Sequence, residues 1–139
     1  MLAPLDPKVW LERGCLVIAV TLTLVFLWAS LVPAASRIAP SGMHHLAHVA
    51  SFGVLTTLWS FAYPRVPSVL MVLSVAAFGF IQEAIEIVGH SHAFEFSDAI
   101  IDAVGTVAGV TFAAAYSNPQ RMMDPDQGGN LDPDAKKRA

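Results

Sequence analysis

Charged residues are scarce in this sequence: Asp, Glu, Lys and Arg together make up 14% of its 139 residues, whereas 55% of the residues are hydrophobic. A water-soluble fold of this length needs more polar surface than so few polar side chains can supply. The formal net charge of −3 also gives no basic surface of the kind that nucleic acids require. The composition therefore predicts a membrane protein and excludes nucleic-acid binding.

Cysteine is nearly absent as well. The single cysteine, Cys15, cannot form a disulfide within the chain, and it lies in an apolar run where a buried, inert thiol is expected. The HExxH pattern of zinc-dependent hydrolases does not occur either. These absences leave the polar residues inside the apolar segments as the candidates for function.

Four apolar segments are present, and they predict an all-α fold, an integral membrane bundle of four transmembrane helices. The predicted spans run over about 14–32, 46–63, 68–88 and 96–116. Each is long enough, as a helix of about 20 residues, to cross a hydrocarbon layer of about 30 Å. The first segment also resembles a signal peptide, but its length and the spans that follow favour a retained helix.

The connecting and terminal segments complete the predicted organisation. Residues 1–13 form an N-terminal lead, and residues 118–139, rich in Pro, Gly and Asp, form a tail predicted to be disordered. Seven of the eight Lys and Arg residues fall on the side that holds both termini, with Arg37 alone on the opposite side. The positive-inside rule then places both termini in the cytoplasm.

Ionisable residues interrupt the apolar segments near their predicted outer ends. Each costs roughly 2.5–3.5 kcal/mol near the centre of a bilayer, so a cluster of them predicts a functional site. Helical spacing puts Glu83, Glu86 and His90 on one face of the third segment, and Asp98 and Asp102 on one face of the fourth. The sequence predicts one outward-facing pocket, lined by His48, Glu83, Glu86, His92, Asp98 and Asp102.

The face of the fourth segment that carries the two aspartates continues as Gly105 and Gly109. Small residues at this spacing let a neighbouring helix approach closely. We therefore expect Gly105 and Gly109 to serve helix packing.

Histidine and carboxylate side chains together also suit a divalent metal such as Zn²⁺ or Mn²⁺. The candidate metal ligands are His48, His90, His92, Glu86 and Asp98. A bound metal could activate water to hydrolyse a lipid head group. Alternatively, the acids and histidines only lock the helices together through interhelical hydrogen bonds.

Three stretches give the chain a likeness to a known family. They are the residues from Ser30 to Pro33, those from His48 to Gly53, and those from Asp98 to Gly105 together with Gly109. On these residues the sequence resembles the VanZ-like family of small membrane proteins. The resemblance implies a four-span bundle in the bacterial inner membrane and an association with low-level resistance to the glycopeptide teicoplanin.

The chain also departs from the family pattern. Glu86 stands where the family has Gln, and His92 stands where it usually has Arg. An Asp-Lys pair common before the family His is replaced by His44 and His45. Positions that carry a permanent positive charge in the family thus hold histidine in this chain.

Three functions follow as expectations. The first is a non-enzymatic envelope protein that binds a lipid-linked envelope precursor or a lipoglycopeptide in the outward pocket, with membrane lipids as its other partners. The second is a metal-dependent membrane hydrolase. The third is a purely structural or assembly subunit, and the sequence leaves open whether the chain forms an oligomer.

Overall fold

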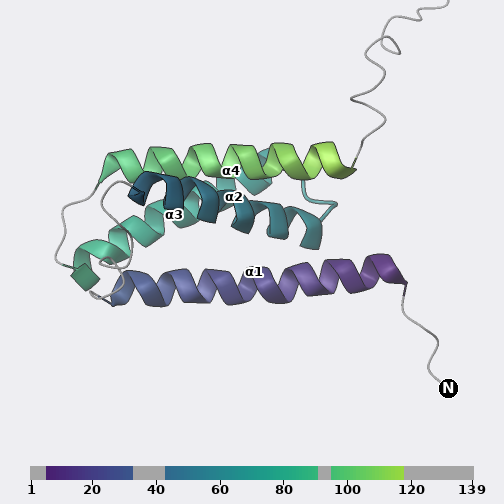
Figure 1. Ribbon diagram of the computed structural model, residues 1–139, viewed down its shortest axis with the longest axis horizontal. Helices are drawn as coiled ribbons and strands as arrows, with labels where there is room; N and C mark the ends of the chain where they lie inside the picture. Colours follow the sequence, from purple (N-terminus) through teal and green to yellow (C-terminus); the bar gives the residue numbers. More distant parts are fainter. Residues whose placement is uncertain (1–5, 33–42, 91–94, 118–139) are drawn as a thin grey trace, which may run out of the picture.

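The computed structural model describes residues 6–32, 43–90 and 95–117, and four helices account for nearly all of them. The helices are α1 (Pro7–Leu31), α2 (His44–Ala62), α3 (Ser68–His90) and α4 (Phe96–Ser117) (Figure 1). They pack side by side as one bundle, and the described residues contain no strand. The predicted all-α bundle of four helices is therefore confirmed.

The helices follow the predicted spans with small shifts at their ends. The first helix begins earlier than its predicted span, at Pro7, so part of the predicted lead is helical. Asp6 explains this start, because its carboxylate accepts a hydrogen bond from the backbone nitrogen of Lys8 at 2.9 Å and Pro7 occupies the first turn. The predicted tail, residues 118–139, lies outside the described residues.

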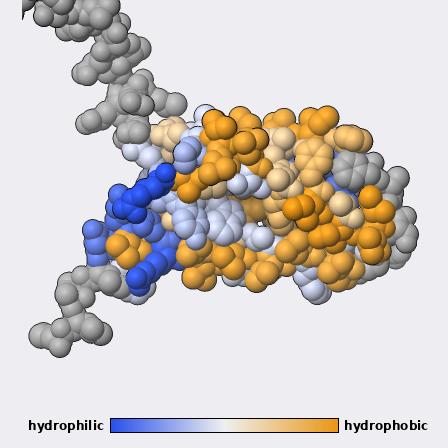
Figure 2. Space-filling model, turned by 180° about the vertical axis from the view of Figure 1, so that it is seen from behind, coloured by the Kyte–Doolittle hydropathy of each residue, from blue (hydrophilic) through white to orange (hydrophobic). Residues whose placement is uncertain are grey.

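Three of the helices have the properties of membrane spans. By length and composition α1, α3 and α4 could each cross a bilayer. Large apolar side chains point outward along them, and the space-filling view shows an apolar flank, with hydrophilic residues gathered at the end where α1 begins (Figure 2). Lipid rather than water suits such a surface, so the chain is a membrane protein.

The second helix, α2, is less apolar than the other three, because its 19 residues include three histidines and four Ser or Thr residues. It compensates by packing inside the bundle. Phe52 is 2% exposed and Leu55 is 1% exposed, and both belong to a core with Met71, Val75 and Val110. The Phe52 ring also stacks on that of Phe26 from α1, with their centroids 6.2 Å apart.

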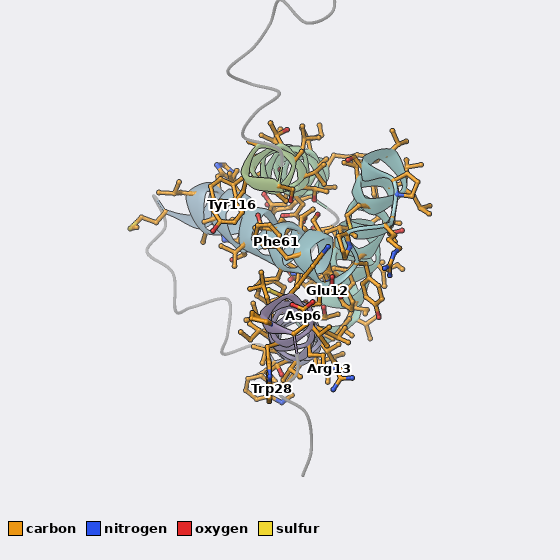
Figure 3. The ribbon with its side chains drawn as sticks, turned by 90° about the vertical axis from the view of Figure 1, so that its right-hand side faces the viewer. Asp6, Glu12, Arg13, Trp28, Phe61 and Tyr116 are labelled. Atoms are coloured by element: carbon orange, nitrogen blue, oxygen red, sulfur yellow. The ribbon has the colours of Figure 1, made fainter. Side chains whose placement is uncertain are left out.

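The chain runs up and down, so α2 and α4 are parallel to each other and antiparallel to α1 and α3 (Figure 1). Although a short turn joins α2 to α3, the closest partner of α2 is α4. Seen along the bundle, α1 and α4 lie at opposite corners (Figure 3). The helices α2 and α3, which the turn joins, therefore pack less on each other than each packs on α4.

Glycines explain why α2 and α4 lie so close. A Cβ atom added at Gly105 would lie 2.5 Å from the carbonyl oxygen of Val49, and one added at Gly109 would overlap the carbonyl oxygen of Gly53. Only a residue without a side chain allows this approach. The Thr57 hydroxyl adds a bond across the same interface, because it lies 3.2 Å from the carbonyl oxygen of Gly109.

Candidate functional site

The end of the bundle where α1 and α3 finish and α2 and α4 begin gathers polar side chains from all four helices (left in Figure 1). We call this set the polar cluster. Its members are Ser30 of α1, His44 and His48 of α2, Gln82, Glu83 and Glu86 of α3, and Asp98 and Asp102 of α4.

Two His–Asp pairs, one helical turn apart, form the centre of the polar cluster. Nε2 of His44 lies 2.9 Å from Oδ2 of Asp98, and Nδ1 of His48 lies 2.8 Å from Oδ1 of Asp102. Both pairs form because α2 and α4 are parallel, so that residues four apart on one helix face residues four apart on the other. The two pairs join α2 to α4 on the N-terminal side of the close contact made by Gly105 and Gly109.

Burial increases from the first pair to the second. The exposed fraction is 42% for the His44 side chain, 13% for His48, 5% for Asp98 and 2% for Asp102. The site is therefore reachable through His44, while its carboxylates are shielded.

The carboxylate of Asp98 is incompletely paired. Its Oδ2 faces His44 and lies 4.0 Å from Nε2 of His48, whereas its Oδ1 is buried and accepts no hydrogen bond. Nε2 of His45 lies 3.7 Å from this oxygen, too far for a hydrogen bond. A buried acceptor without a donor is costly, and Oε1 of Gln82 is a second such atom in the polar cluster, so a bound group that brings its own donor would be stabilised here.

Glutamates of α3 bind the neighbouring helices. The Ser30 hydroxyl donates to Oε1 of Glu86 at 3.1 Å, and Nε2 of Gln82 reaches the same oxygen at 3.3 Å. Glu83 accepts a hydrogen bond from the backbone nitrogen of Glu95 at 2.8 Å. That bond sets a carboxylate beside the N-terminus of α4, where the helix dipole favours negative charge.

A second close contact fixes α1 against α3. A Cβ atom added at Gly89 would overlap the carbonyl oxygen of Ser30. The contact brings the Ser30 hydroxyl within reach of Glu86, so α1 takes part in the polar cluster through one small residue on each helix.

The structure brings some of the predicted site residues together and not others. His48, Asp98 and Asp102 lie together, while Glu83 and Glu86 lie at the same end of the bundle with partners of their own. His92 lies outside the described residues, and only the backbone of His90 is described, at the end of α3.

Sequence reasoning placed His44 just outside the second span and missed it as a site residue. His44 begins α2 and pairs with Asp98. The signal was present in the sequence, since His44 and His48 have the same spacing as Asp98 and Asp102.

Three members of the polar cluster could together hold a metal ion. One ligand atom each from His44, His48 and Asp98 lie within 4.8 Å of one another. His48 and Asp98 belong to the predicted ligand set, whereas Glu86, also predicted, does not belong to this group.

The permanent positive charges of the described residues lie far from the polar cluster. Lys8 and Arg13 are in the first turns of α1, and Arg65 is in the turn between α2 and α3. Figure 3 views the bundle from that end and shows Arg13 with Asp6 and Glu12. In residues 6–32, 43–90 and 95–117 the acids of the polar cluster therefore have only histidines as basic neighbours.

An apolar groove runs along α2 and α4. Its lining includes Ala50, Gly53 and Val54 of α2 and Ala108 and Phe112 of α4, and its volume is about 430 Å³. Ala50 is two residues beyond His48 along α2 but on another side of the helix, and no member of the polar cluster lines the groove.

Comparison of the chain with family models, with curated proteins and with solved structures finds no match in any of the three.

Proposed function

We propose that this chain is a VanZ-like integral membrane protein of the bacterial inner membrane that binds an amphiphilic envelope molecule. The resemblance rests on motif residues that include His48, Asp98 and Asp102, and these three lie together in the polar cluster. That agreement supports the family assignment and, with it, a role related to glycopeptide resistance.

One observation carries the proposal: a buried carboxylate oxygen without a donor, Oδ1 of Asp98, in an apolar bundle. A purely structural lock would pair its acceptors, because unpaired polar atoms are most costly away from water. The open acceptor favours a ligand that brings its own donor.

The chemistry of the polar cluster limits the head group. The carboxylates of Asp98, Asp102, Glu83 and Glu86 accept hydrogen bonds and repel anions. The groups that fit are therefore hydrogen-bond donors, either the hydroxyl groups of a sugar or an amino group. An acyl chain would lie along the apolar outer surface of the bundle, where the groove lined by Ala50, Val54 and Phe112 is one such place.

The distribution of charge supports an orientation. Lys8, Arg13 and Arg65 all lie at the end opposite the polar cluster. By the positive-inside rule this basic end faces the cytoplasm, and both termini lie on that side. The polar cluster then opens toward the outer leaflet, where lipid-linked precursors and lipoglycopeptides are found.

Native mass spectrometry of the protein gently extracted with its lipids tests the proposal. Wild-type protein should retain an amphiphile, and Asp98→Asn, which keeps the size of the side chain, should lower retention about tenfold or more, as expected for the loss of a hydrogen bond to a charged group. Glu12→Gln, at the opposite end of the bundle, is the matched control and should retain the amphiphile fully.

A growth assay provides a second measurement. Wild-type protein expressed in a teicoplanin-sensitive bacterium should raise the inhibitory concentration of teicoplanin, and Asp98→Asn should not. Equal retention by wild-type protein and Asp98→Asn, with no effect of either on growth, would contradict the proposal and favour a structural bundle.

A further inference from the structure

We propose that His44, His48 and Asp98 form a binding site for a transition-metal ion, with Zn²⁺ as the best match, and that Asp102 positions His48 for it. The site uses the polar cluster but does not depend on amphiphile binding. Four arguments lead to it: the spacing of the ligand atoms, the orientation of His48, the local charge and the access from the aqueous boundary.

The ligand atoms have the separations that a metal requires. Zn–N and Zn–O bonds of about 2.1 Å place two ligand atoms of a tetrahedral ion about 3.4 Å apart. Oδ2 of Asp98 lies 2.9 Å from Nε2 of His44 and 4.0 Å from Nε2 of His48. These two distances bracket the tetrahedral value, and all three ligand atoms lie within 4.8 Å of one another, so the side chains need to rotate only slightly closer together to reach one ion.

Asp102 gives His48 the correct orientation. A carboxylate accepts only, so the 2.8 Å contact makes Nδ1 of His48 the hydrogen donor to Oδ1 of Asp102. The lone pair of His48 is then on Nε2, the nitrogen that faces Asp98. This carboxylate–histidine–metal order is the usual arrangement behind a metal-binding histidine. By the same argument Nε2 of His44 donates to Oδ2 of Asp98, so a bound ion would replace that proton, which moves to Nδ1 of His44.

His44 and His48 add a second geometric match. They lie four residues apart on α2, so their rings project from one face of the helix, and the ring centroids are 4.6 Å apart. Two histidines at this spacing commonly share a metal ion. Asp98 supplies the third ligand from α4 and closes the site across the helix interface.

The local charge favours a cation. Asp98 and Asp102 lie close together and are nearly buried, and within the described residues the basic side chains Lys8, Arg13 and Arg65 are all at the other end of the bundle. Oδ1 of Asp98 is buried without a hydrogen bond. A divalent ion held at Oδ2 would offset the negative charge of this carboxylate pair.

The types of ligand atom determine which ion fits the site, and the exposure of the His44 side chain determines how an ion reaches it. Two imidazoles with one carboxylate suit Zn²⁺ and its neighbours, whereas Mg²⁺ and Ca²⁺ prefer sites made of oxygen atoms. His44 is 42% exposed and gives an ion a way in. Three protein ligands leave at least one coordination position for water or for a donor group of a ligand.

The test measures metal binding to full-length protein purified in detergent with a tag that contains no histidine. After treatment with a chelator, the protein is titrated with Zn²⁺ by calorimetry and with Co²⁺ by visible absorption, whose intensity reports tetrahedral coordination. Wild-type protein should bind one ion per chain and give the tetrahedral Co²⁺ spectrum.

The variants separate ligands from bystanders. His44→Gln and Asp98→Asn should each weaken Zn²⁺ binding about 100-fold or more and abolish the Co²⁺ spectrum, while Asp102→Asn should weaken it about 10- to 100-fold. His45→Gln is the matched control, because His45 is 66% exposed and lies 3.7 Å from Asp98, outside the metal group. It should bind as wild-type protein does.

Three outcomes would overturn the proposal: no binding of Zn²⁺ at micromolar concentration, binding that His44→Gln leaves unchanged, or equal losses in His44→Gln and His45→Gln. His44→Gln changes a half-exposed side chain in the first turn of α2, so it should fold, which helix content by circular dichroism and a single peak in size exclusion verify. The titration is done in detergent without added amphiphile, and amphiphile retention is measured in excess chelator. The two proposals therefore fail independently.

Discussion

Replacing Gly105 by Ala should separate α2 from α4 and break the deeper His–Asp pair. The new Cβ atom would lie 2.5 Å from the carbonyl oxygen of Val49, where ordinary contacts begin at 3.4 Å. Because protein interiors are close-packed, α2 must retreat by roughly 1 Å to make room. The 2.8 Å contact between His48 and Asp102 would then exceed the hydrogen-bond limit of about 3.2 Å.

The energetic effect is a difference between two opposing contributions. Overpacking costs about 1–3 kcal/mol, whereas replacing Gly by Ala in a helix contributes up to about 1 kcal/mol of stability. Gly14→Ala isolates the second contribution, because a Cβ atom at Gly14 meets nothing within 4 Å. Gly105→Ala should therefore be less stable than Gly14→Ala by about 1–3 kcal/mol.

Unfolding by titration with sodium dodecyl sulfate in mixed micelles, followed by circular dichroism, measures this gap. Gly105→Ala should also weaken Zn²⁺ binding in the calorimetric titration, and Gly14→Ala should not. Equal stability of the two variants, with unchanged Zn²⁺ binding in both, would refute the reasoning, because it would mean that the α2–α4 contact does not hold His48 against Asp102.

Two further predictions concern hydrogen bonds between helices. Thr57→Val removes the hydrogen bond to the carbonyl oxygen of Gly109 at 3.2 Å and should lower the free energy of unfolding by about 0.6 kcal/mol relative to Thr111→Val. Thr111 is the control because its hydroxyl bonds only within its own helix. The same detergent titration measures both variants, and identical midpoints would contradict the assignment of the bond. Ser30→Ala removes the donor to Glu86 at 3.1 Å and should cost about 1–3 kcal/mol. Ser30→Cys, which keeps a weak donor, should lose less, and equal losses would argue against the bond.

Most of the fold could be predicted from the apolar segments. Their length and the turn residues between them define four helices, and the observed helices begin and end within a few residues of the predicted spans, apart from the earlier start of α1 at Pro7. The glycine pair of α4 also indicated a close contact, although not its partner.

The pairing of α2 with α4 could not be predicted from the sequence. It depends on contacts between residues 54 positions apart, such as His48 and Asp102. Helical periodicity shows which face carries a residue but not which helix it meets. The hydrogen bond from the backbone nitrogen at the start of α4 to Glu83 could not be predicted either, because the spacing of side chains carries no information about backbone partners.

The parallel pairing of α2 and α4 has a consequence for the order in which the protein assembles. As the chain leaves the ribosome, α2 enters the membrane before α4 exists, with its three histidines and without the partner that covers them. Because α2 alone of the four described helices falls short of the apolar composition of a span, we expect its stable insertion to depend on packing against α4. We therefore expect the last helix, α4, to complete the bundle.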